Sequence, residues 1–270
     1  MIVAAAICPS PPLLASELTG QADILPELRT ACAAAVTRIL AAAPEVVAVV
    51  GPAAATGPWD PAGQLSLASF APALGQGNSQ TDNSKKRDAA PPPAAPPPAA
   101  PLLPLALGIG ARLLDQAGYT GPRTLHGISE DEPAAACLAL GRRLAASAPR
   151  VALLAVGDGS ARRSASAPGY LDERAAPFDE SVERAVRDGD LPAIAALDPA
   201  LAAALLAAGR PAWQALAGAL SATSAPHFTG RLAADHRSAA TRPQTEVLYS
   251  DAPLGVAYLV ATFTDRKSVV

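Results

Sequence analysis

The alternation of short, wholly apolar runs with long alanine-rich stretches is the feature that most constrains the fold of this chain. Residues 2–7, 46–50 and 151–156 contain only Ala, Val, Leu and Ile. Runs of this kind are typical of strands that are buried on both faces, as in parallel sheets. Residues 22–43 lie between the first two runs and end before Pro44, and their larger apolar side chains recur at helical spacing. The N-terminal part therefore predicts a β-α-β unit.

The rest of the chain continues this pattern. Further helices are expected over residues 102–116, 133–147, 180–187, 192–196 and 199–218, the last capped by Asp198. Residues 246–249 and 256–263 flank a turn, which predicts two antiparallel closing strands. The predicted fold class is α/β: a single domain with a mostly parallel central sheet, flanked by helices and completed by these antiparallel strands.

Composition changes abruptly at one place inside this predicted domain of residues 1–264. Residues 75–101 are first polar and then almost entirely Pro and Ala, which predicts a disordered surface insertion. A ligand for a proline-recognition domain is the alternative reading of this segment. Residues 265–270 match the translation of a sequencing adaptor, so we expect a non-native tail there; an ordinary polar tail is the alternative.

Charge and cysteine content exclude several classes of protein. The net charge is −3 and no basic cluster is visible, which argues against a nucleic-acid partner. No apolar window reaches the length of a membrane span, and the N-terminus lacks the basic start of a signal peptide. Three widely spaced cysteines, Cys8, Cys32 and Cys137, indicate reduced thiols and a cytoplasmic location.

Ligands of parallel α/β sheets bind beyond the carboxyl ends of the strands. Loops 8–12, 51–60 and 157–163 are therefore expected to lie side by side. The predicted pocket is lined by Cys8, Ser10, Asp158, Ser160, Arg162 and Tyr170, with Asp158 and Ser160 as the catalytic candidates.

The turn at residues 157–160, Gly-Asp-Gly-Ser, also fits an anion cradle of backbone N–H groups assisted by Arg162 and Arg163, or else a plain flexible turn. The charged loop that follows is either a lid over the pocket or a solvated turn in which Asp179 caps the next helix. His126, His227 and His236 are expected at the surface, so no metal site is predicted.

Several segments in order along the chain resemble the class III extradiol ring-cleavage dioxygenases, in particular an actinobacterial branch similar to the B-type subunit of these enzymes. They are MIVAAAICPSPPLL (1–14), VGP (50–52), VGDGS (156–160), APGYLDERAAPFD (167–179), AGRPAWQALAG (208–218) and DAPLGVAY (251–258). The resemblance implies an Fe(II)-dependent opening of aromatic rings. It also implies two histidine ligands, a glutamate ligand and a histidine acid/base.

The positions that match those residues differ in this chain. Ser10 stands in the first loop, loop 51–60 has no histidine, Ala161-Arg162 occupies the acid/base turn and residues 199–213 hold no carboxylate. We therefore expect a dioxygenase-like protein with a degenerate or repurposed site and no cofactor. The ligand would be a small aromatic or anionic molecule. The alternatives are a small-molecule or anion-binding module and a non-catalytic assembly subunit, as a homo-oligomer or with a partner subunit.

Overall fold

Four parallel strands form the centre of the fold: β6 (Arg123–Ile128), β2 (Val46–Pro52), β7 (Val151–Val156) and β1 (Ile2–Cys8). At one edge, β3 (Gly57–Trp59) pairs antiparallel with β6. At the other, β9 (Tyr258–Thr264) pairs antiparallel with β1, and β8 (Gln244–Asp251) with β9. The computed structural model describes residues 1–15, 18, 24–65, 67, 101–224 and 243–264.

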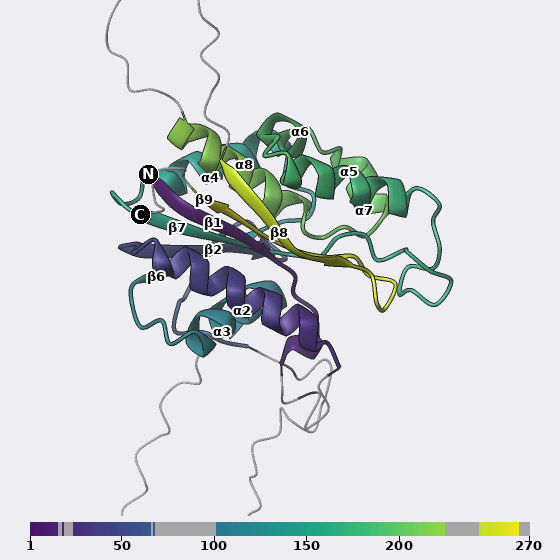
Figure 1. Cartoon of the computed structure of the whole chain (residues 1–270), viewed down its shortest axis with the longest axis horizontal. Helices are drawn as coiled ribbons and strands as arrows, with labels where there is room; N and C mark the ends of the chain where they lie inside the picture. The colour runs from purple at the N-terminus through teal and green to yellow at the C-terminus, as the bar shows by residue number, and fades with distance from the viewer. Residues whose placement is uncertain (16–17, 19–23, 66, 68–100, 225–242, 265–270) are drawn as a thin grey trace, which may run out of the picture.

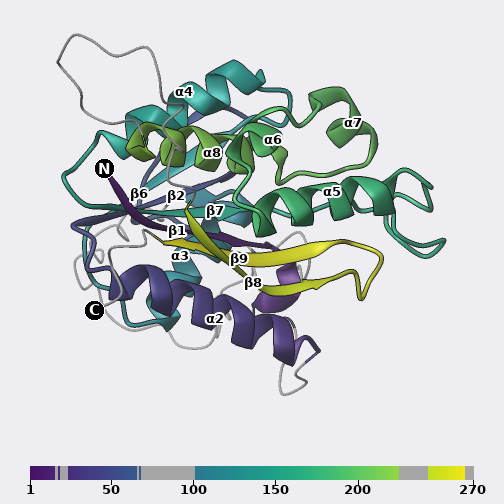
Figure 2. The same cartoon turned by 45° about the horizontal axis from the view of Figure 1, so that its top comes forward.

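Helices cover both faces of this sheet (Figure 1). One face carries α2 (Pro26–Ala41) and α3 (Leu105–Gln116). The other carries α4 (Ala134–Ala145), α5 (Ala175–Arg187), α6 (Leu191–Ala195), α7 (Pro199–Ala204) and α8 (Arg210–Ser224). Figure 2 shows the sheet between these two layers. Three short elements lie outside them: the 3-10 helix η1 (Pro12–Leu14), and β4 (Gln64–Leu65) paired with β5 (Leu102–Leu103).

The two layers explain why the strand sequences are continuously apolar. Along β7, Val151, Leu153 and Ala155 join the core under α4 to α8, while the alternate residues Ala152, Leu154 and Val156 join the core under α2 and α3. Successive side chains of a strand point to opposite faces, so a strand covered on both faces needs apolar residues at every position.

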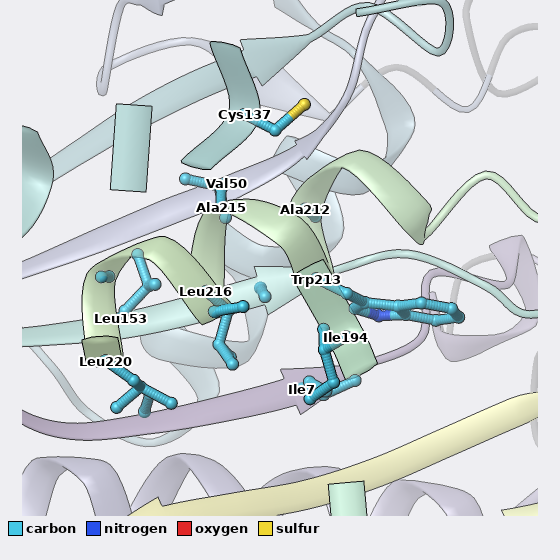
Figure 3. Close-up of a cluster of buried hydrophobic side chains, with 14 of the residues drawn as sticks. Ile7, Val50, Cys137, Leu153, Ile194, Ala212, Trp213, Ala215, Leu216 and Leu220 are labelled. Atoms are coloured by element: carbon cyan, nitrogen blue, oxygen red, sulfur yellow. The ribbon is translucent and has the colours of Figure 1, made fainter. Parts of the chain in front are cut away.

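Small residues let α4 and α8 approach each other very closely. A Cβ atom added to Gly141 would lie 1.8 Å from the Ala215 carbonyl oxygen, and one added to Gly218 would lie 2.3 Å from that of Leu138. Larger side chains of α8 fill the space above the sheet, where Trp213 and Leu216 lie near Ile7 of β1 and Leu153 of β7 (Figure 3).

The predicted fold class is confirmed, and so are the three buried strands and the antiparallel closing pair. The strand β6 was not predicted from the sequence. The prediction of a single helix over 199–218 was also wrong, because α7 ends at Ala204 and α8 begins only at Arg210. Leu206 has a φ of 57° between them, a conformation that a helix interior does not accommodate.

Two of the predicted segments fall outside the part of the chain that the structure describes. They are the insertion at 75–101, apart from Pro101, and the tail at 265–270. Among the described helices, none combines the length and the apolar character that crossing a membrane requires.

Candidate functional site

The carboxyl ends of β1, β2, β6 and β7 open onto a cleft of about 480 Å³. Ser10 follows β1, Pro52 ends β2, Glu130 follows β6 and Asp158 follows β7. The complete lining consists of Ser10, Pro52, Ala53, Ala54, Leu105, Ala106, Ser129, Glu130, Asp158 and Ala208. This is the edge at which parallel α/β sheets bind ligands.

Asp158 is held in this cleft by the loop after β1. The backbone N–H of Ser10 donates to Asp158 Oδ1 over 2.6 Å, and the carbonyl oxygen of Asp158 accepts from the backbone N–H of Gly209 over 2.8 Å. Burial raises the pKa of the Asp158 carboxyl to about 6, although the hydrogen bonds from Ser10 act in the opposite direction. A carboxyl group with this pKa is mostly ionised at neutral pH and close to the range used for proton transfer.

The charges that line the cleft are all negative. Glu130 supplies a second carboxylate, with an exposed side chain, and no Lys, Arg or His is among the lining residues of the described chain. The remaining wall is small and apolar apart from two serines. The cleft therefore offers acceptors at one place and a hydrocarbon surface elsewhere.

Glu130 and Arg210 both belong to this region, and neither was predicted from the sequence. Arg210 is 1% exposed, and its guanidinium donates to the carbonyl oxygens of Glu130 and Glu132 and to Gln214 Oε1, the last at 3.0 Å. Arg210 thus fixes the segment that carries Glu130. Recognising residues 123–128 as a strand would have pointed to Glu130, because it lies just beyond the strand's carboxyl end.

Ser160 does not face this cleft. Its side chain is fully buried, and its hydroxyl donates to Asp179 Oδ2 over 2.5 Å while its backbone N–H donates to Asp179 Oδ1 over 2.9 Å. Arg163 Nη1 lies 3.2 Å from Asp179 Oδ2. Asp179 and Arg163 line a second cavity, of about 240 Å³, between α5 and the β8–β9 hairpin. Ser160 is thus placed as an internal hydrogen-bond donor.

Asp179 is not the helix cap that the sequence suggested. Its helix, α5, begins at Ala175, five residues earlier than expected, so Asp179 lies inside the helix and its carboxylate reaches the loop after β7. Asp198 does cap α7, because its carboxylate accepts from the backbone N–H of Ala200 over 2.9 Å.

The glycine-containing turn after β7 does not form the anion cradle that its sequence suggested. The N–H of Gly157 donates to the Cys8 carbonyl over 2.9 Å, and that of Gly159 donates to the Ala257 carbonyl over 2.8 Å. With the Ser160 N–H bound to Asp179, these donors are used within the protein. They are not directed at a common ligand.

The remaining predicted pocket residues are also dispersed. Arg162 donates from Nε to the Gly169 carbonyl and from Nη1 to the Ala204 carbonyl, both over 2.8 Å. Tyr170 is 74% exposed, and Cys8 lies fully buried in the core beside Cys32. Of the six predicted residues, only Ser10 and Asp158 line the cleft.

The described residues do not fit the ferrous site of the dioxygenases that the sequence resembles. That site needs imidazole donors, whereas the cleft offers two hydroxyl groups and two carboxylates. No group of three metal-ligating side chains occurs in the described part of the chain. His126 is not at the surface as expected but half-buried within β6, where burial lowers its pKa; His227 and His236 lie outside the described residues.

Comparison with known proteins supports the fold alone. No protein-family model matches the chain, and no curated protein matches it. A solved structure, "uncharacterized protein JW3007 from Escherichia coli K12", superposes with a TM-score of 0.51 at 15% identity, covering 96% of this chain and 99% of that one. This chain therefore shares the α/β architecture of that protein over nearly its whole length.

Proposed function

We propose that this chain is an extradiol-dioxygenase-like protein whose strand-end cleft binds a small molecule without the ferrous triad. The observation that carries the proposal is Asp158, a desolvated carboxyl group with a pKa of about 6 that lines the cleft beside apolar side chains. Concave, mostly apolar sites with a few convergent polar groups are the usual form of small-molecule sites. A carboxyl group perturbed in this way is a frequent mark of such a site.

Within this proposal, Asp158 binds the polar end of the ligand. Ser10 keeps the carboxylate oriented, since it supplies the hydrogen bond that reaches Oδ1. Ser160 and Arg162 serve the loop instead, because their polar atoms are bound to Asp179 and to backbone carbonyls.

The test is a ligand-observed NMR screen of small aromatic fragments in the presence of EDTA, on wild type and Asp158→Asn. We expect hits whose binding is weakened in the variant. The matched control is Glu180→Gln, which removes an equal charge from an exposed side chain outside the cleft. A screen in which no fragment binds, or in which the fragments bind Asp158→Asn as tightly as wild type, would contradict the proposal.

A second measurement addresses iron directly. After anaerobic incubation with Fe(II) and desalting, we expect far less than one iron per chain and no ring-fission product from catechol, because two hydroxyls and two carboxylates do not replace imidazoles on iron. Ser10→His alone should not restore either property. One iron per chain with a ring-fission product would establish the dioxygenase activity instead.

An assembly role is the second candidate, and a group of exposed apolar side chains favours it. Tyr170, Leu171, Leu206 and Leu254 are 74%, 58%, 50% and 46% exposed. Gly169 lies against Leu206, which brings the first three of these side chains to one region. Native mass spectrometry of the purified chain tests this role: a dimer or a co-purified partner that is lost in Leu171→Ser would support it, and a monomer would not.

A further inference from the structure

We propose that the ligand of the cleft carries a protonated amine on an apolar body, and that its ammonium group pairs with the Asp158 carboxylate. This inference rests on the proposed function and adds the chemical class of the ligand. Three features support this class of ligand: the Asp158 carboxylate, the negative charge of the lining residues and the apolar walls of the cleft.

Asp158 carries a charge that has no ion-pair partner among the described residues. The carboxylate accepts from Ser10, and no ion pair to it occurs within the described residues. Removing a carboxylate from water without a counter-charge is unfavourable. A cationic group that enters the cleft would supply the missing partner and would also lower the pKa of Asp158, because an opposite charge nearby favours the ionised form.

The surrounding charge has the same sign. Glu130 lines the same cleft and adds a second negative charge, while no cationic side chain of the described chain lines it. The buried guanidinium of Arg210 is bound to the carbonyl oxygens of Glu130 and Glu132 and to Gln214. The side-chain charges of the cleft would therefore repel an anionic ligand, and a neutral ligand would leave the charge of Asp158 without a counter-charge.

The remainder of the cleft surface is apolar. Six of the ten lining residues are Pro, Ala or Leu, namely Pro52, Ala53, Ala54, Leu105, Ala106 and Ala208. These side chains offer a hydrocarbon wall, and a cavity of about 480 Å³ lies within the range that accommodates small organic ligands. An amine attached to a ring or a short hydrocarbon chain matches both parts of the cleft.

The experiment uses three probes that share one ring and differ in charge: benzylamine, benzyl alcohol and benzoate. Dissociation constants are measured by NMR titration of the full chain at pH 7.5. We expect benzylamine to bind about tenfold tighter than benzyl alcohol, a difference of about 1.4 kcal/mol, and benzoate to bind least. Asp158→Asn should remove this preference, leaving benzylamine and benzyl alcohol within about twofold of each other.

Two further variants keep the result interpretable. Glu130→Gln should weaken the binding of benzylamine by about two- to threefold, since an exposed carboxylate contributes less to binding than a desolvated one. Glu180→Gln, which lies outside the cleft, should leave all three constants unchanged. If Asp158→Asn proves unfolded, the order of the three probes on wild type and on Glu130→Gln still decides the question.

The outcomes separate this inference from the function on which it rests. Binding of benzyl alcohol or benzoate as tight as that of benzylamine, with perturbed signals from the cleft residues, would overturn the amine class and leave a small-molecule cleft in place. If all three probes fail while the wider fragment screen finds ligands sensitive to Asp158→Asn, the amine class alone is overturned. If that screen fails as well, the proposed function falls with it.

Discussion

The carboxylate of Asp179 accepts two hydrogen bonds from Ser160, one from the backbone N–H at 2.9 Å and one from the hydroxyl at 2.5 Å. The two residues are 19 positions apart, and the contact joins α5 to the loop after β7. Ser160 is fully buried, so in the intact protein its N–H and its hydroxyl depend on this carboxylate for their hydrogen bonds. The pair therefore holds the loop that leads from the cleft to the second cavity.

Asp179→Ala should lower the free energy of unfolding by about 2 kcal/mol, because a buried N–H and a buried hydroxyl lose their acceptor. Asp179→Asn keeps one acceptor oxygen and should cost about half as much. Urea unfolding followed by circular dichroism measures both. The neighbouring exposed residue gives the control, since Glu180→Gln should change the free energy by less than about 0.5 kcal/mol. Equal effects at positions 179 and 180 would contradict the role given to this pair.

Gly141→Ala tests the close approach of α4 and α8. In a helix without neighbours, alanine in place of glycine stabilises by about 1 kcal/mol. Here the new Cβ would lie 1.8 Å from the Ala215 carbonyl oxygen, so the helices must separate, and we expect a net loss of about 3 kcal/mol or more. Gly57→Ala in β3 is a control for a glycine with free space, because its Cβ would meet nothing within 4 Å. A stabilised Gly141→Ala protein would show that the two helices are farther apart.

The pKa of Asp158 predicts a particular pH dependence of stability. The folded state raises this pKa from 3.8 to about 6, so between these values the folded protein binds more protons than the unfolded chain. The contribution of Asp158 to stability is therefore complete below about pH 4 and is lost as the pH rises through about 6, by at most about 3 kcal/mol.

Urea unfolding at pH 4.5 and pH 7.5 measures this change by comparison with Asp158→Asn, which cannot ionise. The variant should gain stability relative to wild type as the pH rises, since it escapes the cost of a desolvated charge. A difference between the two proteins that stays constant with pH would mean that Asp158 is solvated in the folded state.

Arg162→Lys separates a structural from a binding role for this arginine. The guanidinium bridges the carbonyl oxygens of Gly169 and Ala204, a geometry that a lysine ammonium cannot reproduce at both places. We expect a loss of stability of about 1–2 kcal/mol and unchanged benzylamine affinity. Arg174→Lys is the control, since Arg174 is 60% exposed in its pair with Asp172 and should change stability by less than about 1 kcal/mol. Loss of ligand binding in Arg162→Lys would place this side chain in the cleft.

Local patterns in the sequence were sufficient to predict an element wherever its neighbours along the chain alone determine it. The apolar runs of β1, β2 and β7 could be read as buried strands, because both faces of these strands are covered and every position must be apolar. Asp198 followed by Pro199 marked the start of α7 for an equally local reason, since the cap is a hydrogen bond to the backbone two residues later. Ser10 and Asp158 followed from the rule that ligands bind at the carboxyl ends of parallel strands.

Tertiary structure decided what depends on partners distant in sequence. The strand β6 contains Arg123, Thr124 and His126 and lacks an apolar run, so it becomes a strand through its pairing with β2 on one side and β3 on the other. Hydrogen bonds to distant groups likewise fixed the direction of the loop side chains. The Ser160 hydroxyl donates to Asp179 and does not face the cleft, and the Arg162 guanidinium donates to the carbonyl oxygens of Gly169 and Ala204. The sequence by itself determined the three continuously apolar strands and the edge of the sheet at which the cleft lies. Which loop side chains line that cleft depended on hydrogen bonds between residues far apart in the chain. Buried polar groups of a loop have no solvent to bind, and the tertiary fold determines which partner each of them meets.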